Sequence, residues 1–383
     1  MLGAIIGDTI GSIHEFDPIK TKDFELLGSL NEITDDSYLT MAVFSALEQC
    51  HGDYKKLSTI VSKELIKWYA NYPTPMGGYG KSFENWAINS LQIYKVMKSY
   101  NSYGNGSAMR VSPVAYFARS LDECIELSRK VTKVTHNHPE GIKGAEATAV
   151  AIYMALHGSN KKSISDYIKT HYYSLNENTN QIRKHYGFEP SCQETVPQSI
   201  QAFLDSTCYE DAIRIVVSLG GDADTMGAIT GAIAEAYYGV PSVLEEKILD
   251  YLDERTTPIA KLMISLRNKT ANRYLETGES KRDFQHSMVT GSDMDGYPDI
   301  TQRNAAFKHN GILYKCKDAM KFIKIAEDYT ETPMNEEDFQ FFIDEIRCHL
   351  HRRFAKEITS VEDFYSTLFL ELSSKFWDIS ILC

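Results

Sequence analysis

The chain has 383 residues, of which 43% are hydrophobic and 24% are charged, as is usual for a globular protein. Its formal net charge of −12 disfavours non-specific nucleic-acid binding, since proteins that hold phosphates carry basic surfaces. No apolar run reaches the roughly 18 residues that a membrane-spanning helix requires. The seven cysteines include no Cys-x-x-Cys pair, so neither a disulfide framework nor a structural zinc site is expected. With no basic leader before Asp8, these features predict a cytoplasmic protein.

The first predicted element is an apolar helix over residues 3–15, in which Gly3, Gly7 and Gly11 recur every four residues. This spacing would let another helix approach closely. The helix also carries Asp8 and ends at Glu15, and a carboxylate near a buried stretch costs free energy unless it is paired or bound to a metal. Glu15 is therefore a candidate general acid or base. A solvated residue at a helix end fits the same position equally well.

Two acidic segments far apart in the chain each precede an apolar, helix-like stretch. The first is Thr34-Asp35-Asp36, and the second is Gly220-Gly221-Asp222-Ala223-Asp224-Thr225. Their carboxylate and hydroxyl oxygens are ligands that hard divalent cations prefer. Each segment alone fits a helix N-cap just as well, because acids and hydroxyls are favoured at helix starts. Together the two segments favour a site for two metal ions.

Apolar residues at helical spacing predict further helices up to about residue 265. The segments are Tyr38–Cys50, Leu57–Tyr69, Gly141–His157, Asp211–Leu219 and Gly227–Tyr238. Gly158 follows the third segment, as a glycine commonly follows the end of a helix. We find no sustained alternation of the strand type, so the sequence predicts an all-α core.

Glycine-rich or polar loops separate these helices at residues 76–80, 101–107 and 136–144. Such loops on a helical scaffold commonly carry binding residues. Backbone N–H groups at the turn of residues 104–107 suit a phosphate, and Arg110 could add charge there or pair with a neighbouring helix. His136 and His138 lie in the third loop, where hydrogen bonding is favoured over zinc binding because no cysteine accompanies them.

The composition changes after about residue 268. Residues 268–300 are polar and contain many turn-forming residues, which predicts a linker or an exposed loop after a main domain of residues 1–267. Residues 301–383 are predicted to form an appended, mainly helical unit, with a helix at Glu337–Phe354. This unit could recruit a protein partner, cover a cleft or drive oligomerisation.

In this order, the motifs resemble those of the ADP-ribosylglycohydrolase family, which includes the glycohydrolase that reactivates dinitrogenase reductase. The resemblance covers residues 1–255 and rests on Gly7-Asp8…Gly11-Ser12…Glu15, Thr34-Asp35-Asp36, Gly104-Asn105-Gly106…Met109-Arg110, Thr135-His136…Pro139-Glu140 and Gly220-Gly221-Asp222-x-Asp224-Thr225. It implies a compact all-α fold with two Mg²⁺ ions in a cleft, and Mn²⁺ accepts the same ligands. Ser37 departs from the family, in which a threonine is common at this position.

The resemblance also implies roles for individual residues. The metal ligands would be Thr34, Asp35, Asp36, Asp222, Asp224 and Thr225, and the catalytic residues would be Glu15 and Asp36. The substrate-binding residues would be Gly104, Asn105, Gly106, Ser107, Met109 and His136. The expected reaction is hydrolysis of the glycosidic bond at C1″ of ADP-ribose attached to a protein or small molecule. The alternatives are a non-catalytic ADP-ribose-binding protein and a metal-dependent phosphohydrolase acting on another nucleotide.

Overall fold

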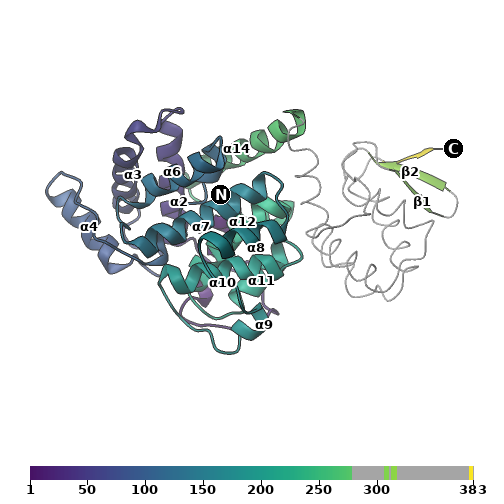
Figure 1. Cartoon of the computed structure of the whole chain (residues 1–383), viewed down its shortest axis with the longest axis horizontal. Helices are drawn as coiled ribbons and strands as arrows, with labels where there is room; N and C mark the ends of the chain where they lie inside the picture. Colours follow the sequence, from purple (N-terminus) through teal and green to yellow (C-terminus); the bar gives the residue numbers. More distant parts are fainter. Residues whose placement is uncertain (278–305, 310–311, 317–378, 383) are drawn as a thin grey trace.

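The computed structural model describes residues 1–277, 306–309, 312–316 and 379–382. Residues 1–277 form a helical domain, which confirms the predicted all-α class for this part of the chain (Figure 1). Its longer helices are α1 (Leu2–Gly11), α2 (Asp35–Gln49), α3 (Leu57–Asn71), α4 (Lys81–Gln92), α6 (Leu121–Thr132), α7 (Pro139–Leu156), α8 (Lys161–His171), α10 (Cys192–Asp205), α11 (Tyr209–Val217), α12 (Ala223–Tyr238) and α14 (Thr256–Thr277). Shorter helices are α5 (Val114–Phe117), α9 (Thr179–Ile182) and α13 (Ser242–Ile248), and 3-10 turns cover Ser12–His14, Tyr54–Lys56, Asn105–Ser107 and Leu249–Tyr251.

Helix α12 lies in the middle of the domain and packs against α1, α7, α10 and α11 (Figure 1). All 16 of its residues are buried, and many of them are alanine or glycine. A helix that is apolar on every side is stable only when neighbours surround it. The core is therefore organised around α12, whose N-terminus carries the second acidic segment.

The backbones of α1 and α12 are in direct contact. A Cβ atom built at Gly7 would lie 2.0 Å from the carbonyl oxygen of Gly227, and one at Gly3 would lie 2.4 Å from that of Gly231. At Gly11, a Cβ atom would lie 2.2 Å from the carbonyl oxygen of Ala223. The four-residue glycine spacing is thus required by this contact. The crossing also brings Asp8 on α1 close to the start of α12.

The predicted helices are present with shifted ends. α2 begins at Asp35 because Thr34 is its N-cap, and the Asp36 N–H donates to Thr34 Oγ1 at 3.2 Å. Gly158, with φ of 82°, follows the end of α7 as expected. Helices α4, α6 and α8 were not predicted, because each buries only a narrow stripe, such as Cys124, Leu127 and Val131 on α6. Helix α10 was not predicted either, and it contains Pro197, a residue that disfavours a helix interior.

The last described part of the chain contains strands. α14 continues to Thr277, past the predicted start of the linker, and most of that linker and the predicted helix at 337–354 lie outside the described residues. β1 (Ala306–His309), β2 (Ile312–Cys316) and β3 (Ile379–Leu382) form an antiparallel sheet in that order, and His309 pairs with Ile312. These strands were not predicted, although Asn310-Gly311 is a dipeptide typical of two-residue hairpins. Among the described helices, none combines the length and apolarity needed to span a membrane.

Candidate active site

The two acidic segments meet at the N-termini of α2 and α12. Thr225 Oγ1 donates to Asp36 Oδ2 at 3.3 Å, although the two residues are 189 positions apart. One carboxylate oxygen from each of Glu15, Asp222 and Asp224 lies within 4.8 Å of the other two. A cavity of about 370 Å³ is lined by five carboxylates, those of Glu15, Asp35, Asp36, Asp222 and Asp224. Glu15, Asp222 and Asp224 could together hold a cation, because carboxylate oxygens are hard donors that divalent cations prefer.

The carboxylates repel one another in a buried environment. Burial and the charge of Asp224 raise the pKa of Asp35, Asp36 and Asp222 well above the ordinary value. The same two causes raise the pKa of Glu15 to about 8. Asp36 Oδ1 is buried and has no hydrogen-bond partner. Because cations would offset the repulsion and satisfy this oxygen, the donor set fits divalent metal ions.

Asp8 supports the first acidic segment from behind. Its Oδ1 accepts the Thr34 hydroxyl at 2.7 Å, and its Oδ2 accepts the N–H groups of Thr34 and Ser37, each at 3.1 Å. The Ser37 hydroxyl also donates to Oδ2, so the serine at this position supplies a hydrogen bond that a threonine could make. Burial and Asp224 raise the pKa of Asp8 to about 7. The sequence signal for this role was a single carboxylate inside an apolar helix.

Thr34 differs from the other predicted metal ligands. Asp35, Asp36, Asp222, Asp224 and Thr225 line the cavity, whereas Thr34 does not. The Thr34 hydroxyl donates to Asp8 and accepts the Asp36 N–H. One lone pair of its oxygen therefore remains available to a metal ion. Thr34 is thus both the cap of α2 and a link between Asp8 and the carboxylates.

The turn at residues 104–107 forms another wall of the cavity. Asn105 Nδ2 donates to Asp222 Oδ2 at 2.7 Å and to Thr195 Oγ1 at 3.1 Å. The Asn105 N–H donates to the Pro190 carbonyl at 2.8 Å, and Gly104 forms a bridge with Ser191. The turn is therefore fixed between the start of α12 and the loop before α10.

Most of the predicted substrate-binding residues line the cavity, namely Gly104, Asn105, Gly106, Met109 and His136. Ser107 does not line it, because its hydroxyl is buried and donates to the Gly141 carbonyl at 2.8 Å. His138 is the N-cap of α7, where its Nδ1 accepts the Glu140 N–H at 3.2 Å. The two histidines of this loop therefore have different surroundings.

His136 is buried beside the turn. Its Nδ1 lies 2.8 Å from Thr135 Oγ1, and a Cβ atom at Gly106 would lie 3.5 Å from its Nε2. Burial and the charge of Arg110 hold the pKa of His136 well below its ordinary value, so the imidazole is neutral. Arg110 Nη2 donates to Thr135 Oγ1 at 2.5 Å, and Arg110 makes no ion pair with any residue that the structure describes.

The loop at residues 76–80 approaches Glu15. Met76 forms a parallel bridge with Thr34, and Gly77 and Gly78 have φ of 76° and 78°. A Cβ atom at Gly77 would lie 2.5 Å from Glu15 Oε2. Glycine at this position lets the loop pass close to the carboxylate.

Sequence reasoning missed several residues that line the cavity. They include Phe16, Tyr79, Lys81, Tyr100 and Phe188. None of these side chains belongs to a polar motif, and the position of Phe16 directly after Glu15 was the one available hint.

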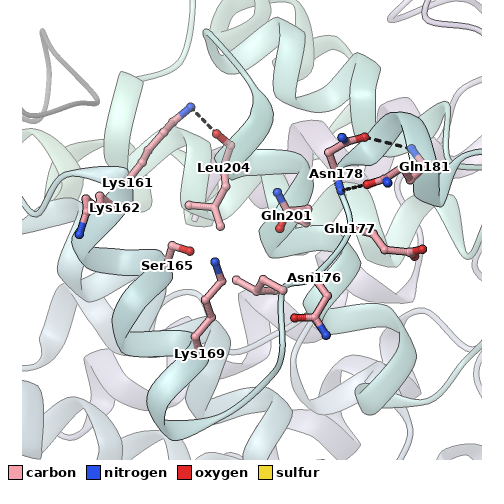
Figure 2. A pocket seen from close by; sticks show the side chains of 11 residues that line it. Lys161, Lys162, Ser165, Lys169, Asn176, Glu177, Asn178, Gln181, Gln201 and Leu204 are labelled. Atoms are coloured by element: carbon pink, nitrogen blue, oxygen red, sulfur yellow. Dashed lines mark hydrogen bonds between the residues drawn. The ribbon is translucent and has the colours of Figure 1, made fainter.

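A second hollow, of about 430 Å³, lies between α8 and α10 and has different chemistry (Figure 2). Lys161, Lys162 and Lys169 line it, together with a single carboxylate, that of Glu177. Lys161 donates to the Leu204 carbonyl at 3.1 Å, and Lys162 donates to Asp166 at 2.9 Å. The clustered carboxylates make the cavity at the starts of α2 and α12, and not this hollow, the candidate active site.

Comparison with protein families agrees with this geometry. A model described as ADP-ribosylglycohydrolase matches residues 1–276. The chain belongs to the ADP-ribosylglycohydrolase family. Family membership indicates ADP-ribosyl hydrolase activity, as the motifs had predicted.

Individual members of the ADP-ribosylglycohydrolase family are distant in sequence. ADP-ribosylarginine hydrolase Tri1 of Pseudomonas putida (strain GB-1) is 25% identical over 268 residues, covering 64% of this chain and 71% of that protein. ADP-ribosylhydrolase ARH3 of Xenopus tropicalis is 26% identical over 306 residues, covering 62% of this chain and 86% of that protein. A solved structure named ADP-ribosylglycohydrolase-related protein complex matches with a TM-score of 0.53 and 20% identity, covering 70% of this chain and 95% of its own. At this identity the structural match shows the shared fold.

Proposed function

We propose that this protein is a metal-dependent hydrolase that cleaves the C1″ glycosidic bond of an ADP-ribosylated protein or small molecule. The contact between Thr225 and Asp36 at 3.3 Å carries the proposal. It joins the two acidic segments in one cavity that also contains Glu15 and the turn at Asn105. A donor set of this kind beside a turn whose glycines line the cavity suits a ligand that has both sugar hydroxyls and phosphates.

The cofactors would be two Mg²⁺ ions, for which Mn²⁺ could substitute. The residues that would hold them are Thr34, Asp35, Asp36, Asp222, Asp224 and Thr225, of which the unpartnered Oδ1 of Asp36 is the clearest open position. When bound, ions in such a site orient substrate hydroxyls and lower the pKa of a bound water.

Glu15 would accept the proton of the attacking water. Its pKa of about 8 in the metal-free protein comes from burial and from Asp224 and Asp8. Nearby positive charge favours the ionised form, so the carboxylate becomes available as a base near neutral pH. The water oxygen bonds to C1″ while the bond from C1″ to the leaving group breaks, and the departing atom takes up a proton from Glu15.

The turn at residues 104–107 and His136 would hold the pyrophosphate. Gly104 and Gly106 bring backbone close to the cavity without side chains in between. Since Arg110 donates to Thr135 Oγ1, the Thr135 hydroxyl proton is free to point to His136 Nδ1. In that tautomer His136 Nε2, beside Gly106, carries the proton and can donate to a phosphate oxygen.

Calorimetric titration of ADP-ribose into the purified protein, with and without Mg²⁺, tests the proposal. We expect binding that requires Mg²⁺ and that Asp35→Ala and Asp222→Ala each abolish. Absence of binding in both conditions would argue against ADP-ribose as the ligand. Product analysis separates the alternatives: free ADP-ribose indicates glycosidic cleavage, AMP or phosphate indicates a phosphohydrolase, and binding without turnover indicates a non-catalytic binder.

A further inference from the structure

Two exposed aromatic rings lie together at the edge of the active-site cavity. Phe16 and Phe188 both line it, and their ring centroids are 6.1 Å apart with planes inclined by 30°. Phe16 is 71% exposed and Phe188 is 51% exposed, although such side chains are usually buried. Single exposed apolar residues are common, but two in contact beside a cluster of carboxylates form a binding surface that the proposed mechanism leaves unused.

The loops that carry these rings are tied to each other and to the carboxylates. Phe16 directly follows Glu15, and Lys20 in the same loop donates to the Tyr186 carbonyl at 2.6 Å. The Tyr186 ring packs on Gly221, where a Cβ atom would lie 2.4 Å from Cε1. Phe188, two residues after Tyr186, is thus held near the segment that contains Asp222. The ring pair is therefore a fixed neighbour of the groups that would act at C1″.

The immediate chain neighbours of both rings include acidic residues. Phe16 lies between Glu15 and Asp17 in the chain, and Glu189 follows Phe188. Among the residues described as lining the cavity, the side chains of Lys and Arg type are Lys81 and Arg110, and Arg110 is buried against Thr135. Exposed ring faces with acidic neighbours suit a flat cation, because a guanidinium stacks on aromatic rings and is attracted to their faces.

Building on the proposed function, we propose that Phe16 and Phe188 contact the group that leaves from C1″ and determine linkage specificity. They select the guanidinium of a modified arginine over the hydroxyl oxygen of a modified serine. The guanidinium has a flat face and positive charge for the two rings and for the flanking carboxylates. A serine side chain has neither, so its linkage gains little from the pair.

Steady-state kinetics with two peptides, one ADP-ribosylated on arginine and one on serine, tests this specificity. For Phe16→Ala and Phe188→Ala, kcat/KM on the arginine-linked peptide should fall roughly tenfold, as expected for loss of a cation–π contact. The serine-linked peptide and the affinity for free ADP-ribose should change little. Phe16→Tyr keeps a ring face and should behave as wild type, whereas Phe16→Leu keeps apolar area alone and should resemble Phe16→Ala. Tyr94→Ala is the matched control, because Tyr94 is 97% exposed and does not line the cavity.

Several outcomes would overturn the specificity role. Unchanged kinetics on the arginine-linked peptide would do so, as would equal losses on both peptides. Weaker binding of ADP-ribose would place the rings against ADP-ribose itself. If the wild-type protein hydrolysed the serine-linked peptide but not the arginine-linked one, the specificity role would also be overturned, but the proposed hydrolase activity would stand. Release of ADP-ribose from neither peptide would instead overturn the hydrolase, and the specificity role with it.

Discussion

Asn105 and Asp222 are 117 positions apart in the sequence, yet Asn105 Nδ2 lies 2.7 Å from Asp222 Oδ2. The hydrogen bond links the turn that would hold the pyrophosphate to the segment that would hold the metal. An uncharged donor fixes one carboxylate oxygen and leaves the other open to a cation. Partners of this kind commonly orient metal ligands.

Replacing the Asn105 side chain should weaken the binding of Mg²⁺ and of ADP-ribose. In Asn105→Ala, Asp222 loses its orienting donor, so we expect the affinity for Mg²⁺ to fall by about 10- to 100-fold and ADP-ribose binding to fall with it. Calorimetric titration of each ligand measures the two effects. Asn176→Ala, on the rim of the second hollow, is the control and should change neither. Unchanged Mg²⁺ affinity in Asn105→Ala would remove the orienting role.

Removing the charge of Asp224 should stabilise the metal-free protein while abolishing activity. Asp224 is the residue whose charge, after burial, most raises the pKa of Asp35, Asp36 and Asp222. We therefore expect Asp224→Asn to have a higher Tm than wild type in EDTA at about pH 8. Added Mg²⁺ should raise the Tm of wild type and have little effect on the variant. Thermal denaturation measures both, with Asp122→Asn in the exposed first turn of α6 as the control; a lower Tm for Asp224→Asn in EDTA would contradict the repulsion argument.

The stability of the metal-free protein should fall as the pH rises. The pKa of Asp8 is raised from 3.8 to about 7 and that of Glu15 from 4.5 to about 8, so the folded state binds more protons than the unfolded state between these values. Their contribution to stability is complete below the unfolded pKa values and is lost as the pH passes the folded ones. In urea denaturation with EDTA, the midpoint concentration should decline from about pH 5 through 6.5 to 8. Replacing EDTA by Mg²⁺ should raise the midpoint, and the increase should be largest at pH 8. A midpoint that rises across this range would count against the buried acidic cluster.

The helix crossing should tolerate no methyl group at Gly7. In Gly7→Ala the new Cβ atom would meet the Gly227 carbonyl oxygen at 2.0 Å, so α1 and α12 must separate. We expect a loss of roughly 1–3 kcal/mol in the free energy of unfolding, or more, even though alanine has the higher helix propensity. Urea denaturation with Mg²⁺ present checks this. Gly187→Ala, where no atom lies within 4 Å of the new Cβ, should stay near wild type; equal stabilities for the two variants would show that the crossing can relax.

We propose that residues 1–277 fold without the remainder of the chain. Ala260 and Met263 on α14 are fully buried, and Arg267 pairs with Glu245 at 2.8 Å. A chain that ends after Thr277 should be folded by circular dichroism and should bind ADP-ribose with Mg²⁺. A chain that ends after Arg255 lacks α14 and should unfold. An insoluble product from residues 1–277 would show that later residues complete the core.

The helices and the acidic segments could be predicted because their signals are local. Apolar spacing marked α2 and α12, and adjacent hard oxygen donors marked Asp35 and Asp36. For Thr34, the sequence offered helix capping and metal binding as alternatives. The structure shows that Thr34 caps α2, whereas Asp36, two residues later, lines the cavity. Capping and cavity lining are thus divided between neighbouring residues.

The parts that were missed depend on how loops pass one another. The approach of Gly77 to Glu15 joins two loops from different parts of the chain, and no repeating pattern of apolar residues in the sequence predicts such a contact. The ring contact between Phe16 and Phe188 likewise joins two distant loops, which the hydrogen bond of Lys20 to the Tyr186 carbonyl also links. Asp8 stood out in the sequence as a charge in an apolar helix, but its four hydrogen bonds to Thr34 and Ser37 required the fold.

The crossing of α1 and α12 has a consequence for which ions the proposed metal site would accept. Because main-chain atoms touch at Gly7 and Gly227, no intervening side chains can adjust the separation of the helices that carry Asp8 and Asp224. The remaining freedom is that of side-chain rotamers, so the site is preorganised before a ligand arrives. An ion with longer ligand distances, such as Ca²⁺, would have to be fitted by those rotamers or by parting the two backbones. We therefore expect the proposed site to discriminate by ionic radius through a glycine contact that is made of main-chain atoms alone.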